Sequence, residues 1–218
     1  MIAAVVFDLD GVLLDSEQVW DEVRERLAAE RGGRYGERDQ RAMMGMSSNE
    51  WSRYMHEVVG LPEPAEEINA EVVRRMLARY RERLPLIPGA VEAVERLAAR
   101  WPLGLASSSN LELIEAFLDA SGLRSRFRAW VSSEEVGRGK PAPDVFVEAA
   151  RRLGVRAARC CAIEDSANGL RAAKAAGMRV VALPNQHYPP PPDAIALADA
   201  VVGSPAELTE AVVSGAAG

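Results

Sequence analysis

The chain has 218 residues, 48% hydrophobic and 27% charged, a composition typical of a globular protein that buries one core, or one core and a small accessory domain. No stretch approaches the roughly 20 consecutive apolar residues of a membrane span, and the short N-terminal apolar run has no basic leader, so we expect a cytoplasmic protein with no membrane partner. A net charge of -6 and a pI near 5.2 argue against a nucleic-acid partner.

The first predicted element is a buried strand over residues 3–7, which ends in the sequence Asp8-Leu9-Asp10-Gly11. In open α/β sheets, ligands bind outside the carboxyl ends of parallel strands, so a site is expected at Asp8 and Asp10. Two carboxylates this close are unfavourable in a cleft unless a cation binds or one of them keeps a proton. Either condition is useful for catalysis.

Residues 17–84 are predicted to be mostly helical, because apolar side chains recur there at helical spacing. We expect one helix from residue 17 to the Gly32-Gly33 pair, a second over 37–44, a third around Trp51 and a fourth over 64–83. Prolines at positions 85 and 88 end this helical insert.

The rest of the chain alternates between helices and short apolar strands. Strands are predicted over 103–106, 129–131, 160–163 and 179–183, with helices before the first three, over 167–176 and near 205–213, and with a proline loop at 189–192. This alternation indicates a parallel sheet covered on both faces, and the first strand joins that sheet. We therefore predict an α/β fold: a Rossmann-like three-layer α/β/α core of residues 1–16 and 86–218, with a small all-helical cap domain, residues 17–85, inserted above Asp8 and Asp10.

The cysteines and histidines are not predicted to form a site. The two cysteines, Cys160 and Cys161, are adjacent in a predicted strand, so their side chains point to opposite faces and we expect reduced core residues. The two histidines, His56 and His187, have no partner at ligand spacing and are expected to be structural or at the surface.

Polar residues follow the later predicted strands. The run Ser107-Ser108-Ser109-Asn110 precedes a helix, where serine hydroxyls and free backbone N–H groups form either an anion site or an ordinary N-cap. Lys140, in a loop shaped by glycines and a proline, is either a solvated charge or an ammonium that projects into a site. Glu164 and Asp165 either complement the dipole of the next helix or bind a hard cation.

Together these residues divide the work of phosphoryl transfer. Asp8 is the candidate nucleophile, because aspartate can form an aspartyl-phosphate, and Asp10 is placed to act as general acid and then as general base. A magnesium ion that bridges Asp8, Asp165 and a phosphate oxygen would offset the repulsion between carboxylate and phosphate. The other phosphate oxygens would be held by Ser107, the N–H of Ser108 and Lys140.

The chain resembles the haloacid dehalogenase superfamily in four motifs, which stand in the family's order: Asp8-x-Asp10-Gly11-x-Leu13-x-Asp15-Ser16-Glu17, Ser107, Gly139-Lys140-Pro141 and Glu164-Asp165-Ser166. The resemblance spans essentially the whole chain and is to the phosphatase and β-phosphoglucomutase-like branch, whose helical cap follows the first strand. It implies a small phosphorylated metabolite as the partner, and it leaves a monomer or a homodimer open.

The same resemblance implies roles for individual residues. Asp8 is the nucleophile, and Asp10 is the general acid/base and also a Mg²⁺ ligand through its backbone carbonyl. Ser107 and Lys140 are phosphate ligands, and Glu164 with Asp165 forms the acidic metal site. Phosphate chemistry is favoured over dehalogenation, because it needs Asp10 and the second acidic site.

Substrate preference is expected to depend on the cap, notably on Trp20 and the loop 45–49. In β-phosphoglucomutases the position of Trp20 is typically histidine, and an arginine at the position of Ser48 would hold the second phosphate of the substrate. Their absence favours hydrolysis. The stretch 16–21 is more similar to hexitol and deoxysugar phosphate phosphatases, so the primary hypothesis is a phosphatase acting on a sugar or polyol phosphate.

Two alternatives stay open. Arg74, Arg75 and Arg79, on the last cap helix, would give a mutase a second phosphate grip. A catalytically silent protein that binds a phosphorylated ligand is the other alternative, and the intact Asp8 and Asp10 argue against it.

Several cap features are also open to more than one interpretation. Trp20 fits either the cap core or a substrate platform, and Met43, Met44 and Met46 are expected to pack. Closure of the cap is expected, with hinges near 15–17 and 84–88.

Overall fold

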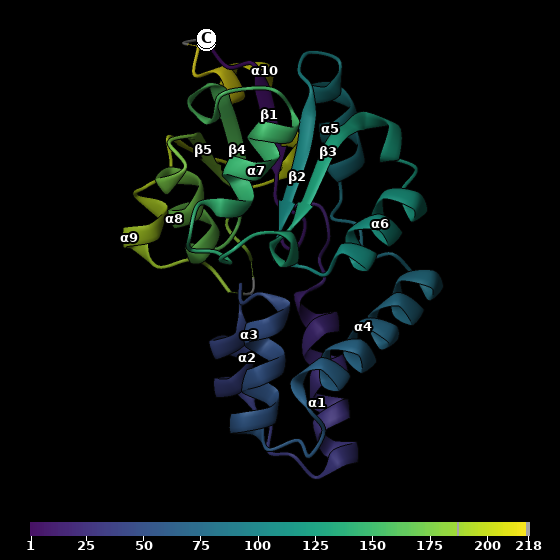
Figure 1. The fold of residues 1–218 in the computed structure, drawn as a ribbon. Helices are drawn as coiled ribbons and strands as arrows, with labels where there is room; N and C mark the ends of the chain where they lie inside the picture. The colour runs from purple at the N-terminus through teal and green to yellow at the C-terminus, as the bar shows by residue number, and fades with distance from the viewer. Residues whose placement is uncertain (187, 217–218) are drawn as a thin grey trace.

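A six-stranded parallel sheet lies at the centre of the larger lobe of the molecule (Figure 1). The computed structural model describes residues 1–186 and 188–216. The strands are β1 (Ala4–Phe7), β2 (Leu103–Ser107), β3 (Phe127–Ser132), β4 (Cys160–Glu164), β5 (Arg179–Ala182) and β6 (Ala200–Val201), in the spatial order β3-β2-β1-β4-β5-β6. The direction of this order reverses between β1 and β4, and in such sheets ligands bind at the carboxyl ends of the two strands that flank the reversal.

Helices cover both faces of the sheet, which confirms the predicted three-layer α/β architecture. One face packs against α5 (Ala90–Ala98), α6 (Leu111–Ala120) and α10 (Glu210–Ser214), and the other against α7 (Asp144–Arg152), α8 (Ala167–Ala175) and α9 (Pro192–Ile195). Successive side chains of each strand point to opposite faces of the sheet, because the strand is pleated. Cys161 belongs to the first face and Cys160 to the second, and both are buried free thiols, as predicted.

A second, helical lobe lies at the end of the sheet to which the arrowheads of β2 and β3 point (Figure 1). It contains α1 (Glu17–Arg31), α2 (Glu37–Met43), α3 (Ser48–Tyr54), a π-helical turn (Met55–Val59) and α4 (Ala65–Glu82). The predicted apolar stripe of α4 is confirmed, because Val72, Val73, Met76 and Tyr80 are buried. This lobe is the inserted cap, and it covers the carboxyl ends of the strands.

The structure differs from the predicted elements mainly near the C-terminus. Strand β6 was not predicted, because it has only two residues and Val201 is exposed. The helix expected near 205–213 is a 3-10 turn (Pro205–Glu207) followed by α10, where the Thr209 side chain accepts a hydrogen bond from the N–H of Val212. Pro192 begins α9 and does not end a loop, since proline fits the first turn of a helix.

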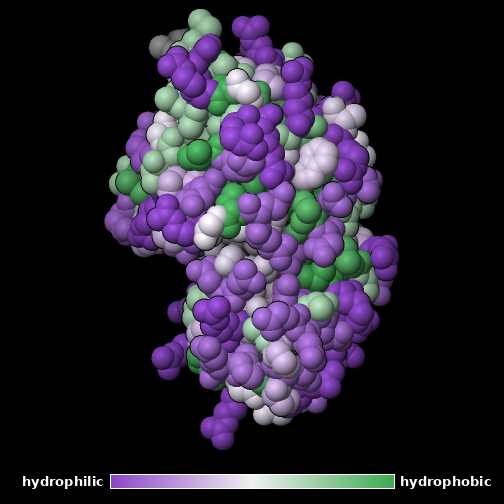
Figure 2. All heavy atoms as spheres, viewed as in Figure 1, coloured by the Kyte–Doolittle hydropathy of each residue, from purple (hydrophilic) through white to green (hydrophobic). Residues whose placement is uncertain are grey.

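Figure 2 shows hydrophilic side chains over most of the visible face of both lobes, and the molecule narrows where the lobes meet. Among the described residues, no helix is both long enough and apolar enough to span a membrane. The exposed His56 donates a hydrogen bond from Nδ1 to the carbonyl of Leu61 (3.0 Å), which fits the structural role expected for it, and His187 lies outside the described residues.

Candidate active site

The loop that follows β1 is folded tightly on itself. The carbonyl of Leu9 accepts hydrogen bonds from the N–H groups of Leu13 (2.9 Å) and Leu14 (3.0 Å), and the N–H of Gly11 donates to the carbonyl of Leu14 (2.7 Å). Gly11 has a φ of 78°, and a Cβ added to it would lie 1.9 Å from Asp165 Oδ2. Glycine is therefore required here on two grounds, and the loop backbone lies directly against the acidic end of β4.

Asp8 forms a buried ion pair with Lys140. The Lys140 Nζ lies 2.8 Å from Asp8 Oδ1 and 2.5 Å from Glu164 Oε1, and it also lies 5.0 Å from the ring centre of Phe146. Burial alone would lower the pKa of Lys140, but the carboxylates of Asp8 and Glu164 outweigh that effect and raise it. Lys140 is thus a fixed cation inside the site, and the interpretation of it as a solvated surface charge is excluded.

Glu164 uses both of its carboxylate oxygens within the protein. Its Oε1 contacts Lys140, and its Oε2 accepts hydrogen bonds from the backbone N–H groups of Asp165 and Ser166, both at 2.9 Å. The side chain lies over the first turn of α8, where a Cβ on Gly169 would be 1.7 Å from Glu164 Oε1. Glu164 therefore couples the N-terminus of α8 to the ammonium of Lys140.

Three buried carboxylates gather between β1 and β4. Asp8, Glu164 and Asp165 each offer an oxygen, and these oxygens lie within 4.8 Å of one another. Burial raises the pKa of Asp8 to about 8 against the pull of Lys140, with Glu164 and Asp10 adding to the rise, and burial also raises the pKa of Asp165. Such crowding of hard oxygen ligands is relieved by a divalent cation, so these residues fit a metal of this kind.

The carboxylate of Asp10 faces away from this cluster, toward the cap. Its Oδ2 accepts a hydrogen bond from Ser109 Oγ (2.6 Å), and its Oδ1 accepts bonds from Ser16 Oγ and from Trp20 Nε1 (3.2 Å). Trp20 is also buried and packs edge-on against Trp51, with the ring centres 5.9 Å apart. Trp20 therefore belongs to the cap core and also contacts the second aspartate, while its role as a substrate platform stays a prediction.

Three consecutive serines at the end of β2, Ser107 to Ser109, have different surroundings. Ser107 is fully buried, and its hydroxyl accepts a hydrogen bond from the N–H of Ser109 (2.9 Å). Ser108 Oγ donates to the carbonyl of Gly45 in the cap (3.3 Å). Sequence reasoning did not select Ser109, and its place in the serine run was the only signal that could have found it.

A cavity between the two lobes contains this chemistry. Its volume is about 50 Å³, enough for only a few water molecules. The core contributes Asp8, Asp10, Ser108, Ser109, Lys140, Asp165 and Ser166 to its lining, and the cap contributes Glu17, Trp20, Arg24, Met43, Met44, Gly45, Met46 and Trp51. The methionines expected to pack thus also face the site, whereas Ser107 is not among the residues that line the cavity, and its role as a phosphate ligand stays a prediction.

The cap is closed on the core by polar contacts. Ser48 Oγ donates to Glu134 Oε1 (2.7 Å), and Asn110 Nδ2 donates to both Glu134 Oε1 (2.7 Å) and Asn69 Oδ1 (3.1 Å). Of the loop 45–49, Gly45 and Met46 reach the cavity, while Ser48 is directed to Glu134 at its edge. The cavity is smaller than a sugar phosphate, so the expected movement of the cap would have to break these contacts to admit one.

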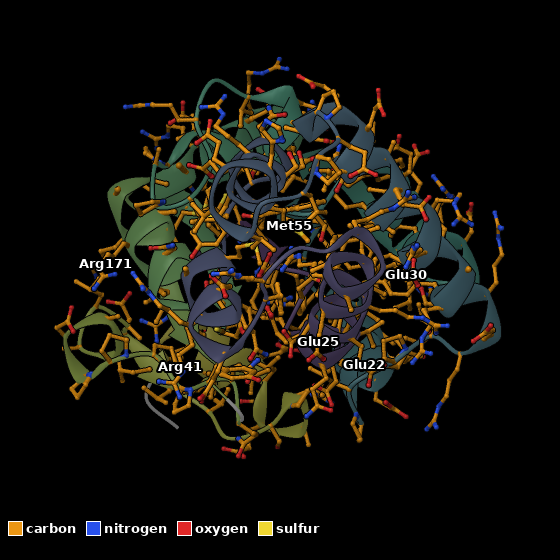
Figure 3. The ribbon with its side chains drawn as sticks, turned by 90° about the horizontal axis from the view of Figure 1, so that it is seen from below. Glu22, Glu25, Glu30, Arg41, Met55 and Arg171 are labelled. Atoms are coloured by element: carbon orange, nitrogen blue, oxygen red, sulfur yellow. The ribbon has the colours of Figure 1, made fainter. Side chains whose placement is uncertain are left out.

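The arginines considered as a second phosphate grip do not reach this cavity. Arg74 pairs with Glu71, Arg75 with Glu30 and Glu71, and Arg79 with Glu22. The three arginines line a separate depression between α1 and α4 together with Glu22 and Glu30, which are labelled on the cap in Figure 3. Arg74, Arg75 and Arg79, considered as a second grip in the mutase alternative, are therefore paired with glutamates on the outer surface of the cap and do not line the cavity in this structure.

The site has the parts of a phosphoryl-transferring hydrolase: a buried aspartate at the switch point of a parallel sheet, a fixed lysine, an acidic cluster suited to a cation, and a second aspartate turned toward the cap. Residues 2–177 match the haloacid dehalogenase-like hydrolase family, and the chain belongs to that family.

Individual relatives agree with this assignment. Hexitol phosphatase B of Escherichia coli strain K12 is 35% identical over 214 residues, which cover 95% of each protein. Fructose-1-phosphate phosphatase YqaB of the same strain is 34% identical over 82% of this chain and 95% of its own length. The crystal structure of CbbY from Rhodobacter sphaeroides in complex with phosphate has a TM-score of 0.86 and 29% identity, and covers 98% of this chain and 100% of that one. The enzyme class is thus that of a phosphatase.

Proposed function

We propose that this phosphatase hydrolyses a small sugar or polyol phosphate, with Mg²⁺ as its metal, through an aspartyl-phosphate on Asp8. The observation that carries the proposal is the position of Asp8, buried against Lys140 and next to Asp165 at the switch point. The names of hexitol phosphatase B and fructose-1-phosphate phosphatase support the substrate class. Asp8 as nucleophile, Lys140 as phosphate ligand and Asp165 as metal ligand then line one cavity, with the cap above them.

In the first step, a carboxylate oxygen of Asp8 attacks phosphorus, and the bond from phosphorus to the sugar oxygen breaks. Asp10 gives its proton to that oxygen, which leaves as a hydroxyl. Lys140, Ser107 and the N–H of Ser108 neutralise the charge on the remaining phosphate oxygens. The hydrogen bonds from Ser16, Trp20 and Ser109 keep Asp10 oriented toward the leaving group.

In the second step, water attacks the phosphorus of the aspartyl-phosphate. Asp10, now ionised, takes a proton from that water, the bond from phosphorus to Asp8 breaks, and inorganic phosphate leaves. The two steps require one residue to give a proton and then recover one. Asp10 fits this role because its carboxylate lies outside the acidic cluster and faces the cap, where the leaving group would be.

The proposed metal ligands are the carboxylates of Asp8 and Asp165, the backbone carbonyl of Asp10, and Glu164 as the remaining acidic group. When bound, Mg²⁺ would neutralise the negative charge that otherwise keeps a carboxylate and a phosphate apart. Glu164 would have a second task, since it also holds Lys140 in place.

Substrate entry is proposed to follow rotation of the cap, residues 17–85, relative to a core of residues 1–16 and 86–218. The two connections between the lobes run side by side: the N–H of Asp15 donates to the carbonyl of Pro85 (2.8 Å), and the N–H of Ile87 donates to the carbonyl of Leu13 (3.0 Å). Two adjacent connections form a compact hinge, so the cap can open without disturbing the sheet.

Phosphate release from a panel of sugar, polyol, glycolate and nucleotide monophosphates tests this function. We expect release from a subset of sugar or polyol phosphates, and less than about 1% of that rate in Asp8→Asn, which keeps the side-chain shape but removes the nucleophile. Formation of glucose 6-phosphate from β-glucose 1-phosphate without free phosphate would establish the mutase alternative. Absence of turnover across the whole panel would contradict the proposal.

A further inference from the structure

The side chain of Arg24 is a buried cation without a contacting anion. Arg24 lies on α1, is 7% exposed and lines the same cavity as Asp8 and Lys140. Within residues 1–186 and 188–216, no hydrogen bond or ion pair engages its guanidinium, and its Nε is buried without a partner. Buried charges in proteins are normally paired or bind a ligand, so the burial of an unpaired Arg24 indicates a site for an anionic ligand.

Other arginines of the cap are satisfied. Arg26 on α1 pairs with Glu30, and on α4 Arg75 pairs with Glu30 and Glu71 and Arg79 with Glu22. These pairs lie on the outer side of the cap, where water also solvates the charges. Arg24 has neither a contacting glutamate nor free access to water, although Arg26 is only two positions away on the same helix.

The surroundings of Arg24 orient it toward a ligand. Its Cζ lies 4.7 Å from the ring centre of Trp20 and 4.8 Å from that of Trp51. Neither ring supplies an oxygen acceptor, so these contacts leave the hydrogen-bonding capacity of the guanidinium N–H groups for an oxyanion. The two tryptophans thus hold the Arg24 guanidinium in place without accepting a hydrogen bond from it.

The position of Arg24 along α1 indicates which part of a substrate it would meet. Glu17, Trp20 and Arg24 are three and four residues apart, so they share one face of the helix, and all three line the cavity. Trp20 contacts Asp10, which would protonate the leaving oxygen. Arg24 is one helical turn, about 5 Å, beyond Trp20, so it is placed to meet the part of the substrate that leads away from the reacting phosphate.

The acidic groups nearby do not serve as the missing partner. Glu17, Asp10 and Asp21 act on Arg24 only from a distance, and none of them forms an ion pair with it. Asp10 accepts hydrogen bonds from Ser16, Trp20 and Ser109, and Asp21 accepts one from the hydroxyl of Tyr35. Burial raises the pKa of Glu17 to about 7, so near neutral pH this group is only partly ionised.

We propose that Arg24 binds a second anionic group of the substrate, a carboxylate or a phosphate carried at the end of the carbon chain opposite the scissile phosphate. This inference rests on the proposed phosphatase function and narrows its substrate class. A guanidinium binds a carboxylate and a phosphate through the same bidentate hydrogen bonds. The structure therefore predicts an oxyanion, and substrates that carry one group or the other distinguish the two. Arg24 is then a specificity-determining residue, distinct from the groups that hold the reacting phosphate.

Three matched six-carbon substrates test the proposal: glucitol 6-phosphate, 6-phosphogluconate and glucitol 1,6-bisphosphate, which differ only at carbon 1. We expect wild-type kcat/KM to be at least about tenfold higher for one or both of the doubly anionic substrates. In Arg24→Met, which keeps an apolar chain beside the indoles, that preference should vanish, so that the kcat/KM values of the variant for the three substrates lie within about twofold of one another. Arg24→Lys should keep part of the preference, and Arg79→Gln, on the outer surface, all of it.

A binding measurement without turnover keeps the test independent of catalysis and of folding defects. Gluconate should raise the melting temperature of wild type and of Arg24→Lys, and it should not raise that of Arg24→Met, whereas glucitol should not distinguish these proteins. An unchanged substrate preference in Arg24→Met, or equal losses on all three substrates, would overturn the inference and leave the phosphatase proposal standing. No phosphate release from any substrate would instead contradict the proposed function itself.

Discussion

The indole N–H of Trp20 donates a hydrogen bond of 3.2 Å to Oδ1 of Asp10, so a cap side chain directly contacts the proposed general acid/base. The two residues belong to different lobes, so we expect opening of the cap to break this bond. It therefore offers a way for the enzyme to complete its catalytic geometry only after a substrate is enclosed.

Replacing Trp20 with Phe should lower kcat by about three- to tenfold, because an aromatic ring remains but the hydrogen-bond donor to the Asp10 carboxyl group is lost. Trp51→Phe is the matched control, since it changes the packing against Trp20 and leaves the hydrogen bond to Asp10 in place. Steady-state kinetics of both variants separates the two effects. An equal loss of kcat in both would show that packing, and not the hydrogen bond, matters.

Asp8→Asn should alter the dependence of stability on pH in metal-free protein. Burial raises the folded-state pKa of Asp8 from 3.8 to about 8, so the folded protein binds an extra proton between these values. The free energy of unfolding of the wild type should therefore fall as the pH rises from about 4 to about 8. The variant lacks this proton.

Melting temperatures in EDTA at pH 5 and pH 8.5 provide the measurement. Wild type should lose more stability than Asp8→Asn between the two conditions, and Mg²⁺ should restore the wild type more at the higher pH. Parallel pH profiles for the two proteins would contradict the raised pKa of Asp8.

Removal of metal by EDTA should abolish phosphate release, and added Mg²⁺ should restore it. Because burial raises the pKa values of Asp8 and Asp165, protons compete with the metal, and the apparent Mg²⁺ affinity should increase by up to about tenfold per pH unit between pH 6 and 8. Activity titrations with Mg²⁺ at three pH values measure this. Asp165→Asn should require more Mg²⁺ than wild type; an EDTA-insensitive rate would show that the metal assignment is wrong.

Glu134→Ala should weaken closure of the cap. The Glu134 carboxylate accepts hydrogen bonds from Ser48 in the cap and from Asn110 and the N–H of Leu111 in the core. Loss of this group should lower kcat/KM by about three- to tenfold.

The control for this variant is Glu25→Ala, an exposed glutamate on the cap helix α1 (Figure 3), which should behave as wild type. Faster hydrogen exchange in α3 of Glu134→Ala, but not of Glu25→Ala, would support a closing contact. If both variants retain full kcat/KM, Glu134 has no part in closure.

Much of the fold follows from the sequence because its signals are local. Apolar runs such as that of β4 and helical stripes such as Val72 to Tyr80 depend on residues within one element, and they predicted the three layers and the helical cap. Where local signals were weak, prediction failed: β6 has two residues, and a 3-10 turn interrupts the helix expected near 205–213.

The sequence by itself also determined the principal residues of the candidate site, since strand ends and motif order predicted that Asp8, Asp10, Lys140 and Asp165 lie together. Only the tertiary structure decided the partners of these groups. Ser109 contacts Asp10 across 99 positions of sequence, and Arg24, not Arg74, Arg75 or Arg79, faces the cavity without an anion. The physical reason is that a side chain's partners depend on how helices of the cap rotate and dock against the sheet, and helical spacing alone does not specify which face meets the core.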